Sequence, residues 1–220
     1  MRDNHPKRRQ QKRQSRRLER KKSTRAGLPA ILVVCEGRET ELNYLQGLCE
    51  EHGVNRANVT IISGEGDTNA AALVRKAQRR FEVDRDFDAV FVVCDCAEED
   101  LTEARRLAAR PLRSITGESF TTTLVMSRPS LEFWLLLHFE YLARPFRSAE
   151  PVVDLLRRHV TDYDKADWQI FAKVRSGLDR ALGRVPRLKA ELAATGAQSP
   201  DTDMPVLAQK ILSLSRRRRD

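Results

Sequence analysis

Two acidic residues, Glu36 and Asp95, each stand at the end of an apolar run. The first run covers residues 30–35 and the second covers residues 89–94. Unbroken apolar runs of this length are typical of strands that are buried on both faces of a parallel sheet. The carboxyl ends of such strands meet at one edge of the sheet, where α/β proteins bind their ligands. The sequence therefore predicts two carboxylates at one edge, which is a candidate site for a hard divalent cation.

A third acid, Glu132, is a candidate for the same edge. It lies in the first turn of a predicted helix that begins at Leu131, where Ser130 can act as the cap. This helix is apolar nearly all round, so we expect it to be buried. An acid in a first turn is favoured by the helix dipole alone. The alternative, which we favour, is that Glu132 is a functional carboxylate.

The elements that must position these acids form a mixed α/β pattern. Further strands are predicted at 59–63 and 120–126, and helices at 38–48, 70–81, 98–110, 151–159, 168–182, 186–194 and 204–215. We therefore predict an α/β core of three layers with a mainly parallel sheet of about four strands. The expected division is a basic arm over residues 1–25, the core over 26–145 and a helical C-terminal extension over 146–220 that packs on the core.

The net charge of +9 resides in the N-terminal segment. Residues 1–25 contain twelve basic and two acidic side chains and almost no apolar ones, so we expect this segment to be disordered. Lysine and arginine release counterions from nucleic acid when they bind it. We expect a nucleic-acid-binding arm here, the alternative being a tail that only keeps the protein soluble. The basic residues proposed for contact are Lys7, Arg8, Arg9, Lys12, Arg13, Arg16, Arg17, Arg20, Lys21 and Lys22.

Other site classes have less support in the sequence. Cys35 and Cys94 lie in the apolar runs, and the Cys94-x-Cys96 spacing does not match a zinc or redox pair. No Gly-Lys-Ser/Thr loop is present for a nucleotide, and the histidines have no evident Ser or Cys partner. No apolar segment is long enough for a membrane span, and none follows the basic N-terminus as a signal peptide would. We expect a cytoplasmic protein without membrane contact.

Several motifs resemble those of the RloB-like family. Residues 33–41 (VVCEGRETE) are similar to the opening motif of that family, and residues 127–139 (SRPSLEFWLLLHF) to its second signature. Tyr163-Asp164-Lys165 and the stretch 199–202 also resemble the family pattern. The similarity covers roughly residues 25–215, and a basic N-terminal tail is common in the family.

The resemblance implies a Toprim-type fold and a role in bacterial mobile defence loci, often beside an ATPase partner. It also implies that Glu36 acts in acid–base chemistry or metal binding, and that Asp95 is the first aspartate of a magnesium-binding Asp-x-Asp motif. The second aspartate would fall at position 97, where this sequence has alanine. Glu98, Glu99 or Asp100 could supply a substitute ligand, although three acids opening a helix also suit its dipole.

These observations lead to two hypotheses. In the first, the protein is a nuclease that uses Mg²⁺ or Mn²⁺ to cleave phosphodiester bonds in DNA or RNA, as in a defence system. Glu36, Asp95 and Glu132 would be the catalytic acids, while Arg38 and Lys165 would bind phosphate. In the second, the protein is a degenerate Toprim module that binds nucleic acid or a partner ATPase without cleavage.

Overall fold

A computed structural model describes residues 28–65, 69–95 and 101–215 of the chain. The predicted basic arm and the acids at positions 98–100 lie outside these ranges. Among the helices that the structure describes, none is long and apolar enough to cross a membrane.

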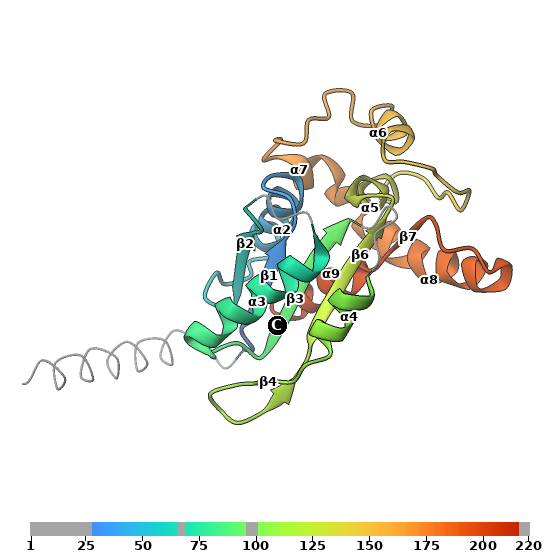
Figure 1. Cartoon of the computed structure of the whole chain (residues 1–220). Helices are drawn as coiled ribbons and strands as arrows, with labels where there is room; N and C mark the ends of the chain where they lie inside the picture. The colour runs from blue at the N-terminus through green and yellow to red at the C-terminus, as the bar shows by residue number, and fades with distance from the viewer. Residues whose placement is uncertain (1–27, 66–68, 96–100, 216–220) are drawn as a thin grey trace, which may run out of the picture.

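The centre of the protein is a five-stranded sheet with the order β2-β1-β3-β6-β7 (Figure 1). The first four strands run parallel, and the two-residue β7 pairs antiparallel with β6. The prediction of an α/β fold with a mainly parallel sheet is confirmed, and β7 is an added edge strand. The strands are β1 (Ile31–Cys35), β2 (Val59–Ser63), β3 (Ala89–Asp95), β6 (Thr122–Arg128) and β7 (Asp201–Thr202).

Helices cover both faces of this sheet. One face packs under α3 (Ala70–Asp84) and α4 (Thr102–Ala108), and the other packs against helices that include α2 (Thr40–Glu51), α5 (Leu131–Leu136) and α9 (Met204–Ser213). In β1, Leu32 and Val34 belong to the first core, whereas Ile31, Val33 and Cys35 belong to the second. Because successive side chains point to opposite faces, burial of both faces requires an unbroken apolar run.

The remaining elements correct several predicted boundaries. The helices predicted at 168–182 and 186–194 are instead a short helix, a 3₁₀ turn and one long helix that continues through Pro186. Val185, Leu188 and Leu192 maintain its buried face, and this packing outweighs the hydrogen bond that proline removes. These elements are α6 (Glu150–Leu156), α7 (Ile170–Val174), η1 (Arg175–Gly177), α8 (Leu178–Thr195) and a hairpin of β4 (Leu112–Arg113) and β5 (Ser119–Phe120).

Candidate functional site

Glu36 and Asp95 lie side by side at the carboxyl edge of the sheet. β1 and β3 are neighbouring parallel strands, and the Glu36 amide extends their pairing by donating to the Val93 carbonyl at 2.9 Å. The Glu36 carboxylate turns back over β3, where its Oε2 accepts a hydrogen bond from the Asp95 amide at 2.9 Å. The structure thus brings together the two acids that the strand pattern placed at one edge.

A cavity of about 380 Å³ opens at this edge. Five carboxylates line it, three more than the strand ends alone provide, together with two cationic side chains. The lining residues are Glu36, Gly37, Arg38, Glu39, Thr40, Glu41, Asp95, Leu131, Glu132 and Lys165. The combination of clustered acids and flanking cations suits a ligand that contains both a metal cation and an anionic group.

Asp95 is the acid whose charge the site disfavours most. Burial, followed by the charges of Glu41, Glu132 and Glu36, raises the pKa of Asp95 to about 8. Its Oδ1 accepts a hydrogen bond from the Leu131 amide at 2.9 Å, which partly offsets the rise. The protein therefore concentrates negative potential at Asp95, and a bound cation would relieve it.

Glu41 is a member of the site that the sequence analysis missed. It is buried in the first turn of α2, and its Oε1 accepts a hydrogen bond from the Gly37 amide at 3.3 Å. Burial raises the pKa of Glu41. A Cβ atom at Gly37 would overlap the Glu41 carboxylate, so the glycine makes this approach possible. The available signal was its position four residues after Gly37 in the sequence.

Glu132 lines the same cavity, but hydrogen bonds engage both of its carboxylate oxygens. Ser130 Oγ donates to Oε2 at 2.5 Å and Tyr163 OH donates to Oε1 at 2.9 Å. Burial alone would raise the pKa of Glu132. The Ser130 bond, the charge of Lys165 and the Tyr163 bond together hold it below its ordinary value. Ser130 thus binds this carboxylate and makes no side-chain cap bond to the helix, contrary to the prediction.

Lys165 reaches the site from the loop between α6 and α7. Its Nζ lies 3.6 Å from Glu132 Oε1, and its side chain is 66% exposed. Two side chains of α2 hold the loop backbone in place. Thr40 Oγ1 donates to the Lys165 carbonyl at 3.0 Å, and Asn43 Nδ2 donates to the Ala166 carbonyl at 3.2 Å.

Arg38 forms the other cationic wall and is exposed. Its Nη2 donates to the Glu65 carbonyl at 3.0 Å, which draws the guanidinium toward the loop after β2. The two cations predicted to bind phosphate therefore both line the cavity of the acids.

Comparison with known proteins yields one match. The family model described as "RloB-like protein" matches residues 31–211, which is most of the chain. The chain belongs to the RloB-like family. No curated protein and no solved structure matches it. The stretch matched to the RloB-like family begins in β1 and ends within α9, so it contains every residue of the cavity described above.

The donor set of this RloB-like site fits a hard cation that keeps part of its own water shell. Among the described residues, no three His, Cys, Asp or Glu side chains are arranged to hold a metal ion by themselves. Mg²⁺ typically takes one or two carboxylates and completes its shell with water and substrate phosphate. Glu36 and Asp95 meet that requirement. The substitute ligands Glu98 and Glu99 lie outside the described residues.

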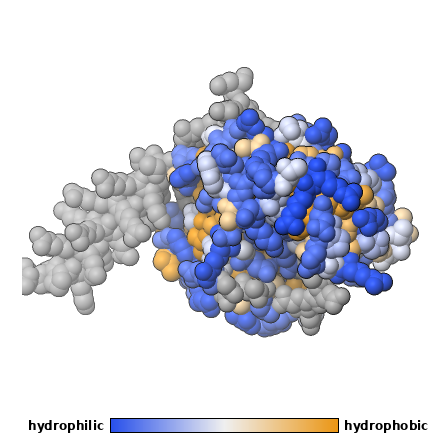
Figure 2. All heavy atoms as spheres, turned by 90° about the horizontal axis from the view of Figure 1, so that it is seen from above, coloured by the Kyte–Doolittle hydropathy of each residue, from blue (hydrophilic) through white to orange (hydrophobic). Residues whose placement is uncertain are grey.

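The surface at the end of the molecule that contains the carboxyl edge of the sheet is polar. Figure 2, viewed from the end toward which the parallel strands point in Figure 1, shows a mainly hydrophilic face with small, separate apolar areas. A face of this kind suits a charged, hydrated ligand more than an apolar partner.

Proposed function

We propose that this member of the RloB-like family is a nuclease that depends on a divalent cation and cleaves phosphodiester bonds in nucleic acid. One observation carries the proposal: Glu36 and Asp95 meet at the carboxyl edge of the sheet, in a cavity that two cationic side chains also line. Phosphodiester hydrolysis needs charge neutralisation at the phosphate and an activated water.

Five residues of the cavity then have a role in the proposed reaction. Glu36 and Asp95 would hold Mg²⁺ or Mn²⁺, which when bound polarises a phosphoryl oxygen and lowers the pKa of a coordinated water. Arg38 and Lys165 would bind the phosphate oxygens. Glu132 remains a candidate general acid or base. Its two engaged oxygens support a positioning role as well, because they tie the loop that carries Lys165 to the start of α5.

The wider biological role also follows as a proposal from the family resemblance. A Toprim-type nuclease in a bacterial defence locus would act on DNA or RNA, with an ATPase from the same locus as a possible partner. The basic segment at residues 1–25 would raise the rate of encounter with this substrate.

A cleavage assay tests the proposal. The full chain is incubated with labelled DNA and RNA in Mg²⁺, in Mn²⁺ and in a chelator, beside the isosteric variants Glu36→Gln and Asp95→Asn. We expect cleavage that requires the cation and falls about 100-fold or more in either variant. Glu118→Gln, an exposed acid in the β4–β5 loop, serves as the control. Equal activity in the wild type and both site variants would exclude the catalytic assignment.

The second candidate is a degenerate Toprim module that binds nucleic acid or a partner ATPase without cutting. Ala97 favours it, because alanine stands where the motif has its second aspartate. So does the finding that no three potential ligands among the described residues surround one cation position. Binding of nucleic acid without cleavage in either metal, unchanged in Glu36→Gln, would support this candidate over the nuclease.

A further inference from the structure

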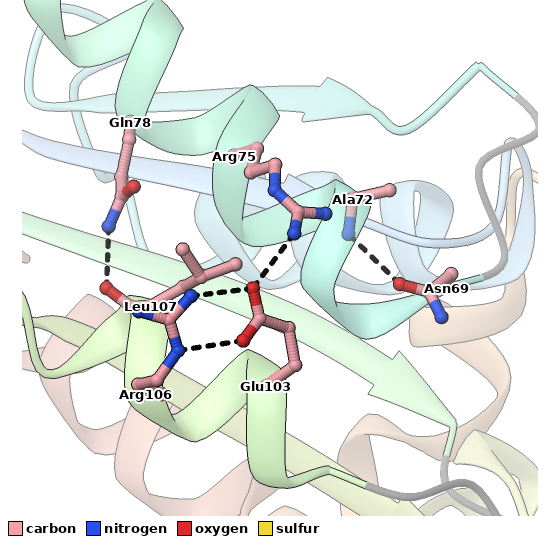
Figure 3. Close-up of polar contacts among 7 residues, drawn as sticks. All are labelled: Asn69, Ala72, Arg75, Gln78, Glu103, Arg106 and Leu107. Atoms are coloured by element: carbon pink, nitrogen blue, oxygen red, sulfur yellow. Dashed lines mark hydrogen bonds and ion pairs between the residues drawn. The ribbon is translucent and has the colours of Figure 1, made fainter.

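Helices α3 and α4 lie against each other on one face of the sheet, and polar contacts join them (Figure 3). Gln78 Nε2 donates to the Leu107 carbonyl at 2.8 Å. Glu103 accepts a hydrogen bond from Arg75 Nη2 at 2.9 Å and two from Arg106, at 2.7 and 2.8 Å. These contacts set arginines of both helices around a single carboxylate.

Helices α3 and α4 and the residues just after α4 are basic, although the described residues as a whole carry balanced charges. The described residues contain 24 basic and 24 acidic side chains. Residues 70–84 and 102–113 together contain eight basic and three acidic ones. An excess of positive charge is thus concentrated on α3, α4 and the five residues that follow α4. We define the seam as Arg75, Arg79, Arg106 and Arg110.

The seam arginines are accessible to a ligand. The side chains of Arg75 and Arg106 are 47% and 57% exposed although both pair with Glu103. Arg79 and Arg110 are exposed, and within the described ranges neither has an ion-pair partner. Among the described residues of α3 and α4, the acids are Glu82, Asp84 and Glu103, and the charge of Arg110 acts on Glu103.

Three basic residues of α8 differ from Arg79 and Arg110 of the seam. Arg184 donates to the Leu137 carbonyl at 2.6 Å, Arg187 pairs with Glu191 at 2.9 Å and Lys189 pairs with Asp203 at 2.6 Å. These three cations are therefore engaged by groups of the protein itself, whereas Arg79 and Arg110 keep spare donor capacity.

The spacing of the seam suits a repeating anion. Arg75 and Arg79 are four residues apart on α3, which places them about 6 Å from one another along its axis. Arg106 lies on α4, and Arg110 follows just after the C-terminal end of that helix. α3 follows β2 and α4 follows β3, so both helices start at the edge of the sheet where the carboxylates lie. The arginines begin within two turns of that edge. A strand that enters the cavity could continue over them.

We propose that the seam binds the phosphate backbone of the nucleic acid substrate, an inference that rests on the function proposed above. Guanidinium groups pair with phosphate oxygens through two parallel hydrogen bonds and stay charged at all relevant pH values. The polar side chains of Gln78 and Glu103 lie between the two helices, whereas the centre of a protein interface is apolar. Because such contacts read phosphate and not bases, binding at the seam is independent of sequence.

Fluorescence anisotropy on the full chain tests the seam. The probes are labelled duplex DNA and duplex RNA of about 25 base pairs, titrated in a chelator over a range of salt concentrations. Arg79→Gln/Arg110→Gln should weaken binding about tenfold and lower the salt slope by about one per arginine. Glu103→Gln should act in the opposite direction, with tighter binding and a steeper slope.

Two controls make the result decisive. Arg158→Gln/Arg180→Gln removes two exposed arginines from elsewhere in the described body and should change binding far less. Arg79→Lys/Arg110→Lys keeps the charge and should keep most of the salt slope. A seam variant that binds no worse than the Arg158/Arg180 control, or a Glu103→Gln protein that binds no tighter, would overturn the inference.

The test also separates the seam from the nuclease proposal. Binding is measured without a divalent cation, so loss of cleavage in Glu36→Gln with an intact seam effect would remove only the nuclease. Normal cation-dependent cleavage together with equal binding by wild type and seam variant would remove only the seam.

Discussion

The Glu36 carboxylate accepts a hydrogen bond from the Asp95 amide at 2.9 Å, although 59 residues separate the two in the chain. The Asp95 carboxylate in turn accepts from the Leu131 amide, at the first residue of α5. These two bonds link the ends of β1 and β3 to the helix that carries Glu132. The carboxylates of the site therefore bind backbone amides of neighbouring elements as part of the fold, and substitutions there should affect both chemistry and stability.

Asp95 should make the stability of the cation-free protein fall as pH rises. Its pKa is about 8 in the folded state, against an ordinary value of 3.8. Between these values the folded protein keeps a proton that the unfolded chain has lost, so the free energy of unfolding declines with pH. Asp95→Asn keeps the hydrogen bond from Leu131 and cannot ionise. We expect it to match the wild type near pH 4 and to exceed it by roughly 2 to 4 kcal/mol at pH 8.

Urea unfolding in a chelator at several pH values measures this difference. A constant difference between Asp95→Asn and wild type from pH 4 to pH 8 would contradict the raised pKa. Addition of Mg²⁺ should reverse the order at pH 8 if Asp95 holds the cation, because only the wild type then gains binding energy.

Gly37→Ala should impair activity while the protein stays folded. The new methyl group would overlap the Glu41 carboxylate, which can move only by leaving the Gly37 amide and its place in the cavity. We expect cleavage to fall about tenfold or more, with a change of about 1 kcal/mol or less in unfolding free energy. Measurements of the cleavage rate and of thermal melting on the same variant check both expectations. Full activity would show that the role of Glu41 does not depend on this glycine, and a large loss of stability would show that Glu41 cannot move aside.

Tyr163→Phe should destabilise the protein in a manner that depends on pH. The phenol donates to the buried Glu132 carboxylate and helps to lower its pKa. A lowered pKa stabilises the fold above the ordinary carboxyl value and is lost as the pH falls. The variant should therefore lose about 1 to 3 kcal/mol at pH 7 and much less near pH 3. Chemical unfolding at both pH values tests the expectation, and an equal loss at both would contradict it.

The sequence revealed the fold and part of the site because those features are local. Apolar runs at 30–35 and 89–94 identify the central strands, and the acids that end them identify one edge of the sheet. Glu41 was missed because an acid in a first helical turn has an ordinary explanation in the helix dipole. The bond from Tyr163 to Glu132 joins residues 31 positions apart and depends on tertiary packing. β7, with two residues, is too short for any periodic signal.

Removal of residues 1–25 should weaken nucleic-acid binding and flatten its salt dependence. Twelve basic side chains would be lost, so the slope should drop by more than the two-arginine seam variant produces. Anisotropy titrations with the same probes measure the effect, and the melting temperature serves as the control for folding. An unchanged slope would show that this segment only keeps the protein soluble.

Two glycines near and within α8 should respond oppositely to alanine. A Cβ at Gly177 would overlap the His138 carbonyl, which belongs to the backbone and cannot move aside cheaply. A Cβ at Gly183, exposed within α8, would meet nothing within 4 Å. Alanine is favoured over glycine inside a helix, so Gly183→Ala should stabilise the protein by about 0.5 to 1 kcal/mol. Gly177→Ala should destabilise it by roughly 1 to 3 kcal/mol. Thermal melts of the two variants measure these changes in stability. A gain in stability from Gly177→Ala would show that η1 does not pack against the segment after α5 as described.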